Sequence, residues 1–225
     1  MPSVTQLAGD FLASQGCPEL GWRILLTAAE IERGVDALAE KVNERYASPS
    51  KPLVLVGILK GVYVLLADLS RRLRIPHSVY FLEASSYSGQ QRGAVEFATK
   101  IAPEKLRGRQ ILLLDELFDN GNTMATMRQA LLDAELDLAP ADICTCTLFI
   151  KQSDSALRKP DLVGLPQLPA LWLVGYGLDD QGEKRGWPHL FACPKADGVP
   201  RVAEDAIFED DTAYAALRRA LVAQL

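Results

Sequence analysis

The sequence is poor in cysteine and histidine, with four cysteines and two histidines among 225 residues. Cysteines so few and so scattered exclude the disulfide framework that holds small secreted domains together. Cys144 and Cys146 lie two residues apart in the apolar run 143–150, so a strand there turns both to one face. They are either ordinary core residues or part of a zinc site, and two histidines supply too few further ligands. Core packing is therefore the favoured interpretation.

The sequence also lacks an excess of positive charge and a long apolar run. Twenty-four basic and 29 acidic side chains give a formal charge of −5 and a pI of about 5.2, which disfavours a nucleic-acid backbone or an anionic membrane as partner. No apolar run reaches the roughly 18 to 20 residues that span a bilayer, and residues 1–10 lack the order of a signal peptide. We therefore expect a cytoplasmic protein without nucleic-acid or membrane partners.

What the sequence does contain is an alternation of helix and strand patterns. Thr27 and Glu30 have the spacing of a capping box, and an amphipathic helical pattern follows them. Strands separated by helices predict an α/β fold with a mostly parallel sheet flanked by helices, in a single domain over residues 1–225, with its ligand site beyond the strand ends. The strands are predicted at 53–58, 77–84, 110–114, 143–150 and 171–174, and further helices at 62–73, 123–136 and within 205–225.

An acidic segment with a glycine loop follows the third predicted strand. Asp115 and Glu116 end the strand, and Asp119 leads into the loop 120–123 at the start of a helix. Backbone N–H groups at a helix N-terminus favour a phosphate, while adjacent carboxylates can accept hydrogen bonds from a sugar diol or orient magnesium. Solvated acids before an ordinary helix cap are the alternative interpretation.

The order of residues 111–123 closely resembles the phosphoribosyl pyrophosphate signature of the type I phosphoribosyltransferases. Further segments resemble the hypoxanthine-guanine branch of that family. The resemblance implies a Rossmann-like core at about 27–180, with a small base-binding hood built from the N-terminal and C-terminal segments. It implies purine salvage: with Mg²⁺, the 5-phosphoribosyl group of phosphoribosyl pyrophosphate is transferred to N9 of hypoxanthine or guanine, giving IMP or GMP and pyrophosphate. It also implies a homodimer or homotetramer.

The resemblance assigns the phosphoribosyl and pyrophosphate contacts. Asp119 matches the general base that handles the N7 proton of the purine. In this family, a cis peptide joins the residues that match Lys60 and Gly61. The residues that match ribose and 5′-phosphate contacts are Asp115, Glu116, Asn120, Gly121, Asn122 and Thr123, and those that match pyrophosphate contacts are Lys60, Gly61 and Arg185.

The remaining matches concern the base, the metal and a lid. Lys151 resembles the residue that donates to the 6-oxo group of the purine, and a donor there favours a 6-oxopurine over adenine. Trp172 resembles the residue that stacks on the base, and the backbone around Leu173 meets the pyrimidine edge. Asp179 resembles the magnesium ligand. Ser86 and Tyr87 resemble the start of a lid that excludes water from the reacting centre.

Two departures from the family pattern leave other substrates open. Asp115-Glu116 reverses the usual Glu-Asp order, and Asn120 replaces the usual Thr or Ser. Transfer to xanthine, adenine or a pyrimidine is one alternative. A regulator that senses nucleotides and binds RNA or DNA with the same fold is another, although the acidic pI disfavours it. Residues 62–66 and the helix within 205–225 are candidate subunit contacts.

Overall fold

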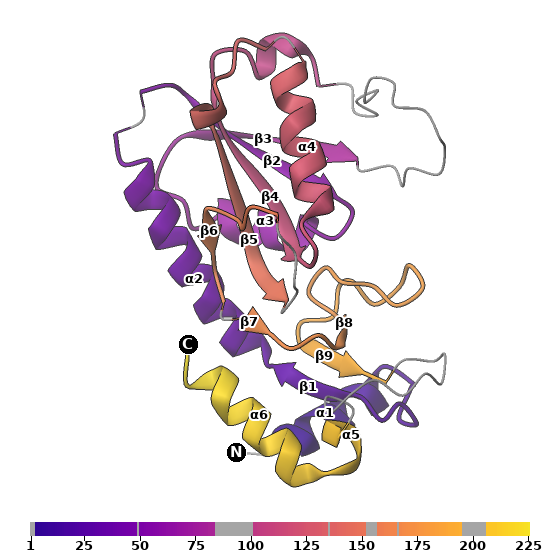
Figure 1. The fold of residues 1–225 in the computed structure, drawn as a ribbon. Coiled ribbons are helices and arrows are strands. Elements are labelled where there is room, and N and C mark those ends of the chain that lie inside the picture. Colours follow the sequence, from indigo (N-terminus) through magenta and orange to yellow (C-terminus); the bar gives the residue numbers. More distant parts are fainter. Residues whose placement is uncertain are drawn as a thin grey trace.

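The computed structural model describes residues 3–48, 50–83, 101–134, 136–151, 157–165, 167–194 and 206–225, and its elements are drawn in Figure 1. The helices are α1 (Val4–Ser14), α2 (Ala28–Arg45), α3 (Tyr63–Ser70), α4 (Asn122–Asp133), α5 (Ala206–Glu209) and α6 (Asp211–Val222). The strands are β1 (Arg23–Leu26), β2 (Leu53–Leu59), β3 (His77–Glu83), β4 (Gln110–Phe118), β5 (Ile143–Lys151), β6 (Leu162–Val163), β7 (Gln167–Leu168), β8 (Trp172–Val174) and β9 (Leu190–Cys193).

The main sheet has the order β3-β2-β4-β5-β6, with β7 paired to the end of β5, and all of these pairs are parallel. Helices α2 and α3 pack on one face through Leu38 and Leu65, and α4 packs on the other through Leu131. Both faces of β2 and β5 are buried, which explains why their sequences are continuous apolar runs. The predicted α/β fold with a mostly parallel sheet flanked by helices is confirmed.

A second, antiparallel sheet has the order β1-β9-β8. The prediction that 171–174 is a fifth strand of the main sheet is therefore wrong. β8 is three residues long, and the chain returns through the turn 175–187 into β9, which runs antiparallel to it. The segment between β8 and β9 has no helix, the usual crossover between parallel neighbours. Figure 1 shows the second sheet lying beyond the ends of β4 and β5.

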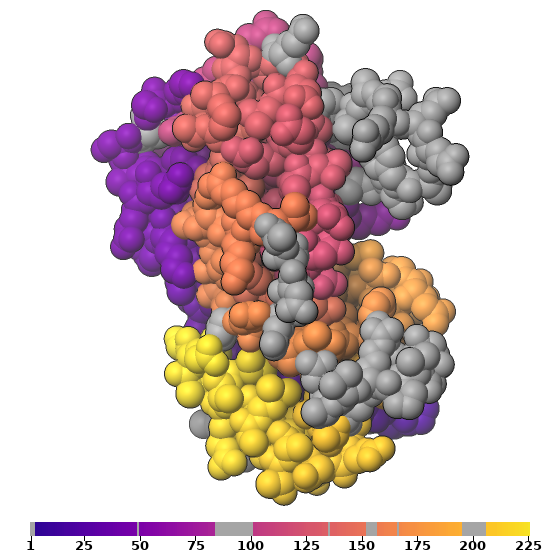
Figure 2. All heavy atoms as spheres, viewed as in Figure 1, coloured from indigo at the N-terminus to yellow at the C-terminus, as the bar shows by residue number. Residues whose placement is uncertain are grey.

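The second sheet is covered by the two ends of the chain. Helix α1 packs on one face, with Leu12 against Ile24 and Phe191. On the other face, residues of α5 and α6 join the same buried cluster as α2 and the main sheet. In Figure 2 the C-terminal segment, in yellow, forms the lower surface next to the orange segment. The terminal helices thus hold the second sheet at a fixed place beside the main one.

The helix predictions are confirmed with small shifts of their ends. Thr27 caps α2 and forms the capping box with Glu30, and α6 covers most of the predicted C-terminal helix. Strand β4 is longer than predicted, because its ladder with β5 continues through Asp115 to Phe118. Among the described residues, no helix is long and apolar enough to cross a membrane.

Helix α6 is fixed by polar contacts to β1 and α2. The Tyr214 hydroxyl donates to the carbonyl of Ile24 at 2.7 Å, and Arg218 donates to the carbonyl of Leu25 at 2.6 Å. Arg218 also forms an ion pair with Glu30, with oxygen-to-nitrogen distances of 2.8 and 3.0 Å, and both side chains are largely buried. Glu30 has its pKa lowered: burial, the largest influence, raises it, but the hydrogen bond from Arg218 and its other partners together outweigh burial.

His189 gives this junction a dependence on pH. Its Nδ1 accepts a hydrogen bond of 2.9 Å from the Ala28 N–H at the start of α2, so the ring is neutral at that nitrogen. Burial lowers the pKa of His189 below its ordinary value of 6.5, although Glu30 opposes the shift. The unfolded chain therefore takes up this proton first as the pH falls. The stability that comes from neutral His189 is present above pH 6.5 and is lost as the pH falls through the folded pKa.

We expect His189→Gln to lower the melting temperature at pH 7.5 and to leave it less sensitive to acidification than in the wild type, because glutamine cannot take up the proton. Thermal melts between pH 7.5 and 5 measure both effects. His77→Gln is the control, since His77 is only half-buried and lies outside this junction. Equal pH dependence of the wild type and His189→Gln would contradict the assignment.

Candidate active site

The loop between β4 and α4 has the form of an anion site. Gly121 is the N-cap of α4 in a left-handed conformation, with φ of 81°, and contributes no capping side chain. The Asn120 Oδ1 accepts a hydrogen bond of 3.0 Å from the Asn122 N–H, which shapes the turn. The first turn of α4 has no acidic residue, and Asn122 and Thr123 are exposed. The helix N-terminus therefore presents a favourable field to a phosphate.

Asp115 and Glu116 lie near the end of β4 and are largely withdrawn from water. Burial raises the pKa of Asp115 well above its usual range, and the charge of Glu116 adds to the effect. Burial likewise raises the pKa of Glu116, although nearby Arg185 opposes the shift. Glu116 is only 8% exposed, and its Oε2 is buried without a hydrogen-bond partner. Such a pair favours a ligand that brings hydrogen-bond donors or positive charge.

Three segments from distant parts of the chain meet at Gly61. A Cβ built on Gly61 would lie 1.8 Å from Glu116 Oε1 and 2.7 Å from the carbonyl oxygen of Gly177, so no side chain fits there. Lys60, the preceding residue, is exposed at the end of β2. The cis peptide bond joins Leu59 to Lys60, one residue before the Lys60–Gly61 bond that the resemblance implied. The turn is made where β2 ends, and Gly61 is already buried beyond it.

The turn 175–187 is closed by its own hydrogen bonds. Arg185 donates to the carbonyl of Gly177 at 2.7 Å and forms an ion pair of 2.5 Å with Asp179. Asp179 also accepts from the Gly182 N–H at 2.7 Å. Lys184 pairs with Asp180 and lies over the rings of Trp22, just before β1, and Trp187, at the end of the turn, at 5.4 and 5.9 Å from the ring centroids. Both tryptophans pack against the cluster of Ile24 and Phe191 in the second sheet. The turn therefore holds Asp179 and Arg185 together and is anchored to the second sheet.

Asp119 and Lys151 face each other across the ends of two neighbouring strands. β4 and β5 pair up to Phe118 and Ile150, so the residue after each pair lies at the same edge of the sheet. Lys151 Nζ is 3.6 Å from Asp119 Oδ2, with the lysine side chain 13% exposed and the aspartate 57% exposed. The structure thus places a carboxylate and an ammonium group side by side next to the phosphate loop.

The remaining predicted site residues are those of the base contacts and the lid. Trp172 is on the edge strand β8 and is 43% exposed, whereas Leu173 is buried in the main core. Ser86 and Tyr87 lie outside the described residues. The contacts around Glu116 bring together the predicted pyrophosphate residues Gly61 and Arg185 and the predicted metal ligand Asp179.

Comparison with known proteins identifies the family. The model of the phosphoribosyl transferase domain matches residues 21–181. The chain belongs to the phosphoribosyltransferase family. It resembles the hypoxanthine-guanine branch: the hypoxanthine phosphoribosyltransferase of Salmonella typhimurium is 33% identical over 169 residues, which cover 74% of this chain and 92% of the relative. The hypoxanthine-guanine phosphoribosyltransferase of Aquifex aeolicus is 32% identical over 171 residues, covering 75% and 93%.

Solved structures agree on the fold of this phosphoribosyltransferase. A hypoxanthine-guanine phosphoribosyltransferase of Bacillus anthracis superposes with a TM-score of 0.62 at 22% identity, covering 76% of this chain and 97% of the other. The hypoxanthine phosphoribosyltransferase of Trypanosoma cruzi has a TM-score of 0.61 at 24% identity, with coverages of 76% and 97%. Helices α1, α5 and α6 lie outside the segment that the family model matches.

The oxygen ligands at the site of this phosphoribosyltransferase fit magnesium. Glu116 Oε2 is an orphaned buried carboxylate oxygen, and Asp179 is close enough to Glu116 to raise its pKa. Within the described ranges, no three acidic, histidine or cysteine side chains gather into a closed metal cage. That arrangement suits Mg²⁺, which keeps several waters and takes one or two carboxylates together with substrate phosphate oxygens.

Sequence reasoning missed two residues of this phosphoribosyltransferase site. Gly177 packs against Gly61: a Cβ on Gly177 would lie 2.3 Å from the Gly61 carbonyl oxygen. Tyr176 precedes it with φ of 47°, between glycines at φ of 100° and 99°. The pattern Gly-Tyr-Gly before Asp179 was the available signal, because closely spaced glycines often mark a backbone conformation that residues with a side chain rarely adopt.

Proposed function

We propose that this protein transfers the 5-phosphoribosyl group of phosphoribosyl pyrophosphate to N9 of hypoxanthine or guanine, giving IMP or GMP and pyrophosphate. The observation that carries the proposal is the pair Asp119 and Lys151, 3.6 Å apart beside a helix N-terminus suited to phosphate. The carboxylate accepts a proton and the ammonium group donates a hydrogen bond, and these complement the N7 proton and the 6-oxo acceptor of a 6-oxopurine. The names of the relatives support the same substrates.

In this proposal the phosphate loop and the carboxylate pair hold the ribosyl half of the donor. Backbone and side-chain donors at Asn120, Gly121, Asn122 and Thr123 bind the 5′-phosphate. Asp115 and Glu116 accept hydrogen bonds from the ribose hydroxyls, which satisfies the orphaned oxygen of Glu116.

The pyrophosphate half lies where the turn 175–187 meets Gly61. Lys60, the backbone of Gly61 and Arg185 bind the pyrophosphate oxygens. Asp179, with Asp115 and Glu116 at the other side, would hold Mg²⁺, which when bound neutralises the leaving group. When phosphoribosyl pyrophosphate binds, Arg185 exchanges its contact with Asp179 for the pyrophosphate oxygens, so its positive charge stabilises the leaving group as the nucleotide forms.

The base lies between the second sheet and the Asp119–Lys151 pair. Lys151 donates to the 6-oxo group, Trp172 stacks on the purine and the backbone at Leu173 meets its pyrimidine edge. Asp119 removes the N7 proton as N9 attacks C1′ of the ribose, so it acts as general base. The second sheet with α1 and α6 is the proposed hood within a single domain, and Ser86 and Tyr87 are the proposed lid. We also propose a cytoplasmic homodimer or homotetramer.

The test is nucleotide formation from phosphoribosyl pyrophosphate and Mg²⁺ with hypoxanthine, guanine, xanthine or adenine offered separately. Chromatography and absorbance follow the products. Rapid formation of IMP or GMP with adenine inert is the expected result. Conversion of xanthine alone would identify xanthine, rather than hypoxanthine or guanine, as the substrate. Failure with every base despite binding of nucleotide would favour a nucleotide sensor that has this fold but does not catalyse the reaction.

Replacing Lys151 with alanine should lower kcat/KM for hypoxanthine and guanine by about 10- to 100-fold, because a charge-assisted hydrogen bond to the base is lost. Steady-state kinetics at saturating phosphoribosyl pyrophosphate measures the effect. Lys159→Ala, at an exposed lysine after β5, is the control and should leave the rates unchanged. If Lys151→Ala changes kcat/KM no more than the control does, Lys151 does not bind the base.

A further inference from the structure

Tyr176 has an unusual backbone conformation and a buried side chain. It has a left-handed φ of 47°, although it is a bulky residue, and this conformation costs on the order of 1 to 3 kcal/mol. Its side chain is 6% exposed and packs edge-on against Phe149, with ring centroids 6.1 Å apart. A strained conformation at a tyrosine persists only where the surroundings fix the side chain.

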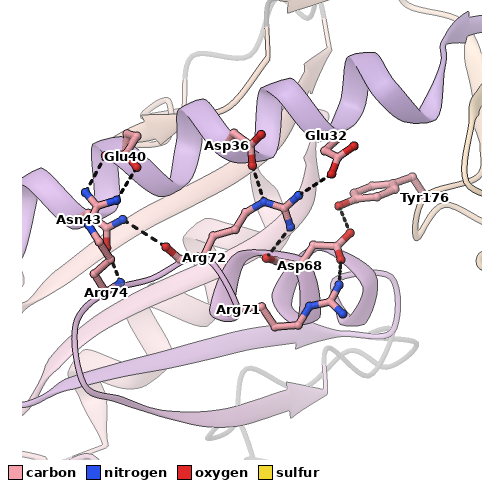
Figure 3. A network of polar contacts seen from close by, with 9 residues as sticks. All are labelled: Glu32, Asp36, Glu40, Asn43, Asp68, Arg71, Arg72, Arg74 and Tyr176. Carbon is pink, nitrogen blue, oxygen red and sulfur yellow. Dashed lines mark hydrogen bonds and ion pairs between the residues drawn. The ribbon is translucent and has the colours of Figure 1, made fainter.

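The surroundings that fix Tyr176 belong to α3. The Tyr176 hydroxyl donates to Asp68 Oδ2 at 2.7 Å (Figure 3). Burial raises the pKa of Tyr176, and the hydrogen bond to Asp68 raises it further, so the phenol stays protonated and remains the donor. This hydrogen bond joins the turn 175–187 to the helix that follows the segment Lys60-Gly61 in the chain.

Asp68 is itself held in place. Its carboxylate pairs with Arg71, and its backbone carbonyl accepts a hydrogen bond of 3.0 Å from Arg72. Arg72 in turn pairs with Glu32 and Asp36 on α2, as Figure 3 shows. The acceptor of the Tyr176 hydroxyl is therefore fixed to two helices of the main fold.

The two segments that this hydrogen bond joins each carry part of the proposed pyrophosphate site. Gly61 lies just before α3, and Gly177 follows Tyr176 directly. The two backbones are in such close contact that neither glycine accepts a Cβ. The Gly177 carbonyl also accepts from Arg185, which pairs with Asp179. A shift of Tyr176 would thus move Arg185 and Asp179 relative to Lys60 and Gly61.

We propose that Tyr176 is a positioning residue for pyrophosphate. By donating to Asp68, it sets the turn with Asp179 and Arg185 at the correct distance from Lys60 and Gly61, so that both sides contact one magnesium pyrophosphate group. This inference rests on the proposed function. Tyr176 does not position the phosphate loop or Lys151, because these lie at the ends of β4 and β5 and the start of α4.

The test is calorimetric titration of Tyr176→Phe with magnesium pyrophosphate and, separately, with GMP. Magnesium pyrophosphate should bind about tenfold more weakly than to the wild type, the size expected for one hydrogen bond to a charged group. GMP occupies the base, ribose and 5′-phosphate contacts but not the pyrophosphate contacts, and its affinity should stay within about twofold of the wild-type value. The KM for phosphoribosyl pyrophosphate should rise while the KM for the base does not.

Tyr214→Phe is the matched control. It also removes a buried tyrosine hydroxyl with a hydrogen bond of 2.7 Å, but to Ile24 in the second sheet. We expect a lower melting temperature in both variants and weaker pyrophosphate binding only in Tyr176→Phe. Equal pyrophosphate affinities in the two variants would overturn the positioning role, as would an equal loss of GMP and pyrophosphate affinity in Tyr176→Phe.

Substitutions of Asp68 provide a second route to the same test. Asp68→Ala removes the acceptor and should weaken magnesium pyrophosphate binding as much as Tyr176→Phe, with no further loss in the double variant. Asp68→Asn keeps an acceptor oxygen and should bind nearly as the wild type does. Additive losses in the double variant would contradict the inference. A wild-type protein that binds neither magnesium pyrophosphate nor GMP would instead overturn the proposed function.

Discussion

Asp119→Asn should form nucleotide about a hundredfold to ten-thousandfold more slowly than the wild type, the range that a general base contributes. Asparagine has nearly the same shape but does not take up the N7 proton. The carboxylate is 57% exposed, so the substitution removes no buried negative charge, and the amide oxygen of asparagine can still accept from the largely buried Lys151. Quench-flow or steady-state rates with hypoxanthine and guanine measure the loss in kcat.

The same variant should bind IMP and GMP almost as the wild type does, because the 5′-phosphate and base contacts are retained. Asp133→Asn, at the far end of α4, is the control and should have the wild-type rate. A kcat for Asp119→Asn within about threefold of the wild type, against the hundredfold or more expected, would remove the general-base assignment. A loss of nucleotide affinity equal to the loss of rate would assign Asp119 to binding instead.

Gly61→Ala should abolish high-affinity pyrophosphate binding, with a loss of at least roughly a hundredfold, since a shift of about 1 Å at a positioned site can cost that much. Its Cβ would overlap Glu116 Oε1 at 1.8 Å and would approach the Gly177 carbonyl oxygen at 2.7 Å. The side chain of Glu116 can rotate, but the Gly177 contact is with backbone. The turn that carries Asp179 and Arg185 must therefore move. Overpacking of this kind also costs about 1 to 3 kcal/mol of stability.

Calorimetric titration with magnesium pyrophosphate and thermal melts measure both effects. Gly9→Ala is the control, because a Cβ on Gly9 in α1 meets nothing within 4 Å; it should leave binding unchanged and stabilise the helix by up to about 1 kcal/mol. Wild-type pyrophosphate affinity in Gly61→Ala would show that the site does not depend on the contact between Gly61, Glu116 and Gly177.

The sequence predicted the main sheet well because its strands are buried on both faces. The run 53–58 leaves no polar position, and such a run is typical of a central parallel strand. The end of β4 was harder to predict. The predicted strand ended at residue 114, before Asp115 and Glu116, yet the pairing of β4 with β5 continues to Phe118. Hydrogen bonding to a neighbouring strand decides where a strand ends, and no local pattern records it.

The second sheet was predicted only in part, and for a similar reason. The segment 171–174 reads as an apolar strand, and the sequence contains nothing that states its direction relative to β5. Its pairing with β9 follows from the turn 175–187. Six residues of this turn have positive φ, three of them consecutive and two more adjacent: Gly175, Tyr176, Gly177, Gln181, Gly182 and Lys184. Three of these six are not glycine, so composition alone did not predict the conformation.

By itself, the sequence determined the local structural motifs of this protein. They are the capping box of α2, the buried strands, and the glycine loop at the start of α4 with two carboxylates before it. These depend on residues within a few positions of one another, and spacing records them. Only the tertiary structure decided that Gly61, Glu116 and Gly177 share one contact, and that Tyr176 is held by Asp68. Such contacts join segments far apart in the chain, and close packing of specific side chains, rather than any local preference, selects them.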